Sequence, residues 1–368
     1  MNRYLQYGSV EAIPYYNCSW KSFEEWEQTG IKRPYLGWPL VIFGTCIELI
    51  YIPIIYIIFK TNLIKHACYK IIVVLISIDM SATFCSCLIT GPLLIIGSVF
   101  CMYPTFTYLA GGIALVYYFL ISPIGAEIIK LNVDGSEGLL LEEIRRFSKT
   151  SNYKITVSWC MACAATVSLF ANRVISIAFR EYADAIEKKL AYSSIAFIFL
   201  YGAFIYIFTP TVCYNSVIMA WIANPLSEEF PSAEADEAYR NPTQAWNNWI
   251  FLVSIFTLFS VYFCMVKKLA QGQKSKASRS IFIQCSIICF FNTCIALVYN
   301  ALNYITLSPG ILIFVQCCWA MNHASPAFIY MTMNHTIRRE YKKLVFGVLS
   351  QKVEDTSTAK VTTSQSRI

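Results

Sequence analysis

The stretch IIVVLISIDMSATFCSCLITGPLLIIG, residues 71–97, holds one charged side chain, Asp79, in an otherwise apolar run. It exceeds the roughly 20 apolar residues that a helix needs to cross a lipid bilayer. The whole chain is 57% hydrophobic and only 14% charged, and its mean hydropathy is +0.51. Because a soluble protein carries roughly 25% charged residues, this chain cannot cover its apolar surface in water. We therefore predict an integral membrane protein.

Further apolar segments lie on both sides of this stretch. They are Trp38–Phe59, Pro104–Ser122, Ile155–Phe179, Ala191–Tyr214, Asn248–Val266, Ile281–Tyr304 and Ile311–Met333. Residues 1–37 contain no apolar run long enough for a signal peptide, so no cleaved leader is expected before the first span. Most of the 15 cysteines lie inside the apolar segments. We interpret them as small hydrophobic residues, since their spacing is not that of metal ligands.

Basic residues predict the orientation, because links rich in lysine and arginine stay on the cytoplasmic side. Such links follow Phe59, Phe179, Val266 and Met333. Their basic residues are Lys60, Lys65, Lys70, Arg180, Lys188, Lys189, Lys267, Lys268, Lys274, Lys276, Arg279, Arg338, Arg339, Lys342 and Lys343. The N-terminal segment, the links near Cys101 and Ser308, and the loop 215–247 are then expected outside. The net charge of +7 is thus a topology signal and does not indicate a nucleic-acid site.

The number of spans follows from parity. An odd number of crossings must separate the outer link at Cys101 from the inner link at Arg180. Two apolar segments lie between these links, however, with a polar stretch, 132–154, between the two. Seven crossings satisfy every charged link and eight do not. One of the two segments is therefore not expected to span.

Short motifs follow one another in a specific order along nearly the whole chain. They are Tyr16-Asn17-Cys18-Ser19, Arg33-Pro34, Tyr51-Ile52-Pro53, Cys68-Tyr69-Lys70, Ile78-Asp79, Phe100-Cys101, Ala171-Asn172-Arg173, Ile281-Phe282-Ile283-Gln284 and Ile337-Arg338-Arg339-Glu340-Tyr341. In this order the chain resembles the nematode chemosensory receptors called serpentine receptor class T. The resemblance implies an all-α fold, a seven-transmembrane-helix bundle of rhodopsin-like architecture. It also implies a chemosensory G-protein-coupled receptor that binds an extracellular small-molecule or peptide cue and activates a heterotrimeric G protein.

The chain departs from that family in the helix-three region. In similar receptors helix three runs without interruption, whereas an unusual insertion, about 114–154, divides it here. The parity argument finds one apolar segment too many in the same region. The stretch is therefore either a real insertion or a wrongly predicted exon. The expected organisation is an extracellular N-terminal segment (1–37), a seven-helix transmembrane domain (38–333) and a cytoplasmic tail (334–368) with a short amphipathic helix.

Three residues are candidates for a conformational switch. Asp79 lies mid-helix, where a carboxylate is costly unless it faces the bundle interior, and it resembles the sodium-linked aspartate of seven-helix receptors. Pro326 with Tyr330 resembles the Asn-Pro-x-x-Tyr motif one residue out of register, and proline permits a kink. A satisfied structural contact is the alternative for Asp79, and a purely structural kink is the alternative for Pro326. For Glu48 we favour packing or snorkelling.

Two further sites follow from the resemblance and from position. Asn172 and Arg173 take the place of the acid-Arg-Tyr motif at the cytoplasmic end of helix three, which implies a role in G-protein coupling. An ordinary positive-inside arginine is the alternative. Tyr299, Asn303 and Gln316, near the outer ends of the last two helices, are candidates for ligand contact, with packing or lipid-facing roles as the alternative.

The outer side carries two expected covalent features. Asn17 begins a glycosylation sequon, Asn17-Cys18-Ser19, whereas the second sequon, at Asn334, is expected inside and unmodified. Cys18 and Cys101 are expected to form a disulfide. Cys213 is the alternative partner of Cys101.

The sequence contains no sign of enzyme chemistry. No phosphate loop, metal-spaced cluster or nucleophile motif is present, so we expect no catalytic residue, metal or cofactor. The expected partners are the lipid bilayer, a heterotrimeric G protein and an unknown extracellular ligand, and no nucleic acid. A multi-pass transporter or channel is the alternative, although such proteins favour internal repeats and none is visible. The expected location is the plasma membrane with the N-terminus extracellular. The membrane of sensory cilia is one candidate for the specific location.

Overall fold

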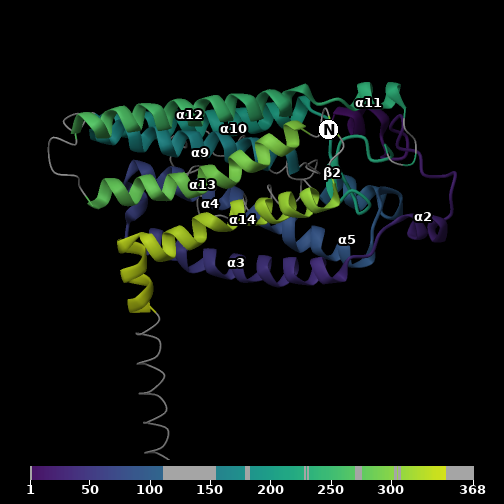
Figure 1. Ribbon diagram of the computed structural model, residues 1–368, viewed down its shortest axis with the longest axis horizontal. Coiled ribbons are helices and arrows are strands. Elements are labelled where there is room, and N and C mark those ends of the chain that lie inside the picture. Colours follow the sequence, from purple (N-terminus) through teal and green to yellow (C-terminus); the bar gives the residue numbers. More distant parts are fainter. Residues whose placement is uncertain are drawn as a thin grey trace, which may run out of the picture.

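The computed structural model describes residues 2–110, 155–178, 183–227, 229, 232–269, 276–301, 305 and 308–344. Within these residues, long helical segments lie alongside one another as a bundle (Figure 1). They are α3 (Pro34–Lys60), the continuous segment of α4 (Ala67–Thr83), η2 (Phe84–Ile89) and α5 (Thr90–Ile96), then α9 (Ile155–Ala178), α10 (Ala183–Phe208), α12 (Pro242–Leu269), α13 (Lys276–Ala301) and α14 (Pro309–Met333). The architecture is all-α, as the sequence predicts.

Hydropathy divides these helices into two groups. Among the described residues, 5 helices are long and apolar enough to cross a membrane, namely α3, the Ala67–Ile96 segment, α9, α10 and α12. α13 adds a shorter apolar stretch, Ser286–Ala301. α14 carries Gln316, Asn322 and His323, which lower its hydropathy, but all three side chains are buried. The polar residues of α14 therefore face protein rather than lipid.

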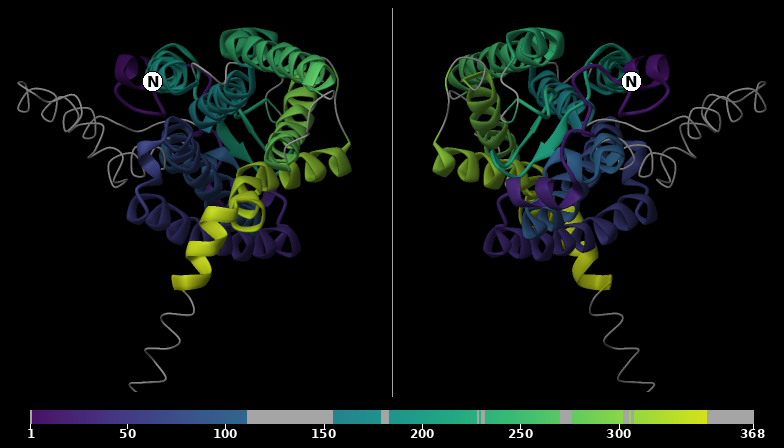
Figure 2. Two further views of the ribbon diagram at one scale, coloured as in Figure 1. Left: turned by 90° about the vertical axis from the view of Figure 1, so that its left-hand side faces the viewer. Right: turned by 90° about the vertical axis from the view of Figure 1, so that its right-hand side faces the viewer.

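The bundle has two ends, which we call the N-terminal side and the tail side. The N-terminal side carries α1 (Asn2–Tyr7), α2 (Phe23–Thr29), η3 (Phe100–Met102), β1 (Cys213–Asn215), β2 (Ala220–Ile222) and α11 (Ala233–Tyr239). β1 and β2 form an antiparallel hairpin in which Tyr214 lies opposite Trp221. On the tail side, η1 (Leu63–Lys65) joins α3 to α4. A helix over 335–344 follows α14 there and runs across the bundle axis (Figures 1 and 2).

Glycines allow the first two membrane helices to approach closely. A Cβ atom at Gly37 of α3 would lie 2.5 Å from the carbonyl oxygen of Gly91 in α5, and one at Gly91 would lie 2.9 Å from the carbonyl oxygen of Gly37. Neither position has room for a larger residue. Small residues at helix contacts are typical of membrane bundles, because close packing holds their helices together.

α9 occupies the place of helix three, because it packs against α4, α10, α12 and α13. Its bounds agree with the expected span Ile155–Phe179. The expected segment Pro104–Ser122 is described only as far as residue 110, where it is helical from residue 104. The rest of that segment and the predicted insertion lie outside the described residues.

One helix ends earlier than the apolar pattern indicates. The apolar run Ala191–Tyr214 predicts a span that continues to Tyr214, but α10 ends at Phe208. Pro210 explains the difference, since proline has no N–H for the helix and disfavours helical backbone in the residue before it. The apolar residues after Pro210 instead lead into the β1–β2 hairpin.

The N-terminal segment is folded and has its own small core. Its apolar residues cluster with residues of the loops on the same side of the bundle, and the cluster includes Val10, Ile13, Tyr16, Trp26, Val99, Phe100, Met102, Tyr108, Cys213, Leu226 and Tyr239. Ser22 caps α2 through a reciprocal pair of hydrogen bonds with Glu25. Cys18 and Cys101 are joined by a disulfide, with their Cα atoms 5.4 Å apart. We call residues 2–33 the cap.

Candidate functional site

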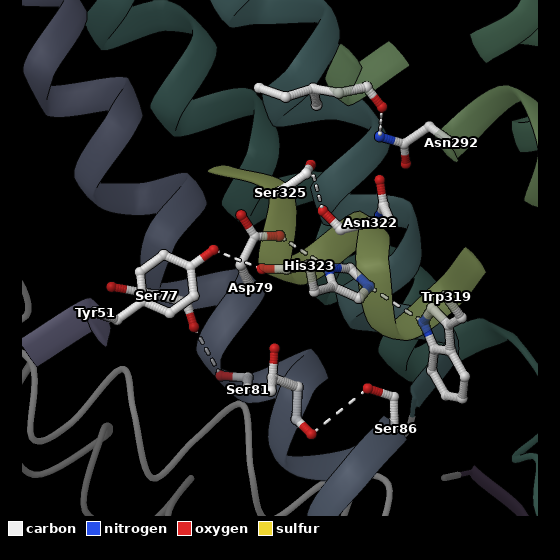
Figure 3. Close-up of polar contacts among 12 residues, drawn as sticks. Tyr51, Ser77, Asp79, Ser81, Ser86, Asn292, Trp319, Asn322, His323 and Ser325 are labelled. Carbon is white, nitrogen blue, oxygen red and sulfur yellow. Dashed lines mark hydrogen bonds and ion pairs between the residues drawn. The ribbon is translucent and has the colours of Figure 1, made fainter. Parts of the chain in front are cut away.

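Asp79 forms a buried pair with His323. Asp79 lies in α4 and His323 in α14, and their exposed fractions are 2% and 0%. His323 Nδ1 lies 2.8 Å from Asp79 Oδ1 (Figure 3). The second carboxylate oxygen, Oδ2, has no hydrogen-bond partner among the described residues. Because a carboxylate inside a membrane bundle is costly unless it is satisfied, this single contact joins helix two of the bundle (α4, η2 and α5) strongly to helix seven (α14).

Trp319 determines which nitrogen of His323 carries the proton. Its indole Nε1 donates to His323 Nε2 at 3.1 Å. An indole N–H can only donate, so Nε2 has to accept, and the proton of the neutral imidazole is then on Nδ1. Nδ1 therefore donates to Asp79. The three side chains form a directed relay, from Trp319 through a neutral His323 to a carboxylate.

Side chains also stabilise the backbone around Pro326. Proline has no N–H, so the carbonyl of Asn322 loses the donor that a regular helix would provide. The Ser325 hydroxyl donates to this carbonyl at 3.0 Å. The hydroxyl of Tyr51 in α3 donates to the next carbonyl, that of His323, at 2.5 Å. The proline turn is therefore attached both to its own helix and to helix one (Figure 3).

Helix two contains a π-helical turn at η2, and two other parts of the chain hold it. Gln316 Nε2 in α14 donates to the carbonyl of Ser86 at 3.0 Å. Trp221 Nε1 in the hairpin donates to Oγ1 of Thr90 at 3.0 Å. Wide turns of this kind are frequent at functional sites, because they leave backbone groups available to other partners. Gln316, a candidate for ligand contact, thus bonds to the protein itself.

A small aromatic pocket lies beside Trp319, on the N-terminal side of the relay. Its volume is about 30 Å³, and it is lined by Trp159, Val212, Trp221, Gln244, Ile295, Tyr299 and Trp319. Such a volume holds about one or two water-sized groups, so the pocket is small for a ligand site. Tyr299, a second candidate for ligand contact, lies in its wall. Asn303, the third candidate, lies outside the described residues.

A polar network lies beside the pocket, at the N-terminal-side ends of α9, α12 and α13. Trp159 Nε1 donates to Asn248 Oδ1 at 2.8 Å, and Asn248 Nδ2 donates to Asn300 Oδ1 at 3.1 Å. The indole N–H groups of all three pocket tryptophans therefore donate to protein atoms. The pocket presents mainly ring faces and aliphatic groups to anything that enters it.

Asn172 and Arg173 lie near the opposite, tail-side end of the bundle. Asn172 is completely buried, whereas Arg173 is half-buried. Arg173 lies beside the Cys68 side chain of α4, close enough to interact with it electrostatically. The neighbouring Tyr69 accepts a hydrogen bond from Asn334 Nδ2 at 3.1 Å, just after α14. The tail-side end of helix three therefore contacts helix two, which in turn contacts the end of helix seven.

The remaining candidate residues lie as follows. Tyr330 is buried in α14. Asn17 is exposed in the cap, and its Oδ1 accepts a hydrogen bond from the Ser19 backbone N–H at 2.9 Å. Cys213, the alternative partner of Cys101, is a buried free thiol. Among the described residues no group of three or more His, Cys, Asp or Glu side chains is arranged to hold a metal ion.

Sequence reasoning did not identify His323, Trp319 or Tyr51 as site residues. A signal existed for His323, because an ionisable side chain inside an apolar segment is a functional candidate by itself. Trp319 lies four residues before it, on the same helix face. Tyr51 had no such signal, since its partner is a carbonyl made available by the geometry of another helix.

Comparison with known proteins gives a consistent result. The sequence model of the serpentine type 7TM GPCR chemoreceptor Srt matches residues 3–128 and 153–355. The interval between these two matches falls within the predicted insertion. A Caenorhabditis elegans protein named Serpentine receptor class T-55 is 22% identical over 350 residues, which cover 90% of this chain and 80% of that protein. This chain therefore belongs to the Srt family of serpentine chemoreceptors, a family of multi-pass membrane receptors rather than enzymes.

Proposed function

We propose that this receptor detects a chemical cue from outside the cell and activates a heterotrimeric G protein at its tail side. The observation that carries the proposal is the double role of Trp319. One part of its side chain lines the aromatic pocket, and its N–H donates to His323 in the relay. A molecule that enters the pocket and moves Trp319 must therefore alter a hydrogen bond to the buried Asp79–His323 pair.

The proposed orientation places the cap and the hairpin outside. The tail side carries the described basic residues Lys60, Lys65, Lys70, Arg338 and Arg339, and short basic links stay in the cytoplasm. The helix over 335–344 runs across the bundle axis (Figure 1). This direction suits a helix that lies along the inner surface of the membrane. The same orientation predicts a location in the plasma membrane and a glycan on Asn17.

Transmission through the bundle follows from the contacts of helix two. Asp79 joins α4 to α14 in the middle of the bundle, and the same helix packs against α9 and places Cys68 beside Arg173 at its tail-side end. A shift of α14 that weakens the Asp79–His323 contact releases helix two, and helix two forms one wall around Arg173. A ligand acts in this way only if it binds one arrangement of the helices more tightly than the other.

The experiment compares Trp319→Phe with Phe314→Leu. Phe at position 319 keeps an aromatic ring in the pocket and removes only the N–H donor. Phe314 lies on the same helix but is 54% exposed, toward lipid, and serves as the control. Cells that express the chain with a G-protein reporter are screened with a chemical panel, and the half-maximal concentration of each active compound is measured for both variants.

We expect Trp319→Phe to shift the half-maximal concentration by roughly fivefold, since a buried hydrogen bond contributes about 1 kcal/mol. Phe314→Leu should leave it unchanged. An equal response of the wild type and Trp319→Phe would remove the relay from the mechanism. A chain that gives no reporter signal, but moves substrates across proteoliposomes without a G protein, would instead be a transporter.

A further inference from the structure

A second cavity, much larger than the aromatic pocket, lies beneath the cap. Its volume is about 260 Å³. The walls come from the cap, from Tyr108, from the end of α10 with the residues that follow it, and from the end of α11. The lining residues are Arg3, Ile13, Tyr16, Tyr108, Ile207, Phe208, Thr209, Pro210, Thr211, Ala238, Tyr239 and Arg240. This volume approaches the lower end of the range for small-molecule sites.

The charged side chains that line this cavity are both cationic, Arg3 and Arg240. The acids of α11 have other partners or pair with Arg240. Glu234 accepts from Tyr15 at 3.5 Å and Asp236 accepts from Asn224 at 2.7 Å, whereas Glu237 lies 3.6 Å from Arg240 at the exposed rim. Arg3 has no carboxylate partner among the described residues. Arg3 is therefore the cation of this cavity that favours an anion, although the loop 215–247 as a whole is acidic.

Arg3 is held in place without using all of its donors. Its guanidinium lies over the Tyr239 ring, 4.2 Å from the centroid, and Nη2 donates to the carbonyl of Ala238 at 2.5 Å. A guanidinium has five N–H donors in a fixed fork that suits a carboxylate. The ring contact and the carbonyl bond fix the orientation of the group. The other donors are left for a ligand.

Two of the three tyrosines that line the cavity, Tyr16 and Tyr239, remain neutral and do not repel an anion. Burial raises the pKa of Tyr16 well above its ordinary value, and burial also raises the pKa of Tyr239. Their hydroxyl groups donate to the carbonyls of Ala223 and Pro14 respectively. These two tyrosines therefore provide ring surface and leave Arg3 as the anion-binding group.

The other wall of the cavity is mixed. Ile13, Ile207, Phe208 and Pro210 supply its apolar groups and Thr209 and Thr211 supply hydroxyl groups, and Phe208 is 66% exposed at the end of its membrane helix. A cation at one side and an aliphatic and aromatic wall at the other suit a molecule with an anionic head and an apolar body. An inorganic anion would leave that wall without a partner.

The two cavities share one wall. Thr211 lines the large cavity, whereas its neighbour Val212 lines the aromatic pocket beside Trp319. The same segment continues into β1, whose partner strand carries Trp221. A molecule that displaces Thr211 therefore also displaces Val212 in the wall of the aromatic pocket, because the two residues are adjacent in the chain.

We propose that the cavity beneath the cap binds an amphipathic organic anion, with its carboxylate on Arg3 and its apolar body against Ile207 and Phe208. The site is separate from the aromatic pocket and biases it through the Thr211–Val212 wall. This inference rests on the proposed orientation, which makes the cavity accessible from outside. Such an anion comes either from solution or from the head group of an anionic lipid.

The test uses the full chain in phosphatidylcholine nanodiscs, with hexanoate as the probe and 1-hexanol and hexylammonium as matched neutral and cationic compounds. Binding is measured by saturation-transfer NMR. We expect hexanoate to bind more tightly than the other two, and Arg3→Gln to weaken it at least tenfold. Arg3→Lys should weaken it less, because the charge remains. Lys32→Gln is the control, since Lys32 is exposed and pairs with Glu27 at 2.8 Å.

Two further arms separate the outcomes. If a lipid head group is the natural occupant, nanodiscs with phosphatidylserine should reduce hexanoate binding to the wild type but not to Arg3→Gln. In Asp79→Asn the site should still bind hexanoate, so that a failed relay does not hide a working site. Equal binding of hexanoate and 1-hexanol, or unchanged binding in a folded Arg3→Gln variant, would overturn the proposal.

Discussion

Replacing His323 by leucine tests the energetic role of the buried pair. The carboxylate of Asp79 loses the donor at 2.8 Å, and no other described residue donates to its Oδ2. A buried acceptor that loses its donor costs about 1–3 kcal/mol, and more when the acceptor is charged. Proton uptake by the carboxylate limits this cost, since a buried acid neutralises rather than remain charged without a partner. We therefore expect a loss of about 3 kcal/mol for His323→Leu.

The double variant Asp79→Leu with His323→Leu separates this effect from a loss of packing. It removes both polar partners, so only the Trp319 N–H is left without its acceptor, at a cost of about 1–3 kcal/mol. Thermal unfolding of the purified protein in detergent should rank the double variant above His323→Leu, with Phe314→Leu close to the wild type. A double variant that is less stable than His323→Leu would refute the reasoning, because the carboxylate would then not be the source of the cost.

The remaining predictions concern the two ends of the bundle. Arg173→Lys should reach the cell surface normally yet signal poorly, because an ammonium cannot reproduce the fork-shaped hydrogen bonds of the guanidinium; full reporter output with normal surface labelling would leave Arg173 as an orientation charge only. Cys18→Ser and Cys101→Ser should each lower the free energy of unfolding by the roughly 2–5 kcal/mol that a native disulfide contributes, and should therefore lower surface expression equally. A clear inequality between the two variants would count against a shared bond. Asn17→Gln should remove a glycan shift on a gel while Asn334→Gln changes nothing, and a glycan on Asn334 would reverse the proposed topology.

The positions of most helices could be predicted from the sequence, because each apolar run has to cover a bilayer with backbone hydrogen bonds satisfied internally. The run Ile311–Met333 corresponds to α14, Pro309–Met333. Prediction was wrong where local chemistry competed with hydropathy. Pro210 ends the helical path that the apolar run up to Tyr214 indicates. The folded cap also escaped prediction, since its core combines residues of the N-terminus with residues of distant loops.

For the candidate site, sequence reasoning identified Asp79 from cost alone, because a carboxylate in an apolar helix has to face protein. It did not identify the partner, and a cation or any polar group was equally compatible with the pattern. Pro326 was likewise visible as a break in the hydrogen bonding of its helix. Its compensation by Ser325 was local and could have been deduced, whereas the contact of Tyr51 with the His323 carbonyl joins residues far apart in the chain.

The sequence by itself determined that this protein resides in a membrane and which polar residues in its apolar segments need an explanation, and its basic links predict an orientation. These conclusions depend on composition and on local order, because the bilayer acts on each segment separately. Only the tertiary structure decided that His323 meets Asp79, that Trp319 connects this pair to the aromatic pocket, and that Arg3 lines a cavity beneath the cap. These contacts depend on the directions in which separate helices and loops present their side chains, and no local pattern in the chain encodes those directions.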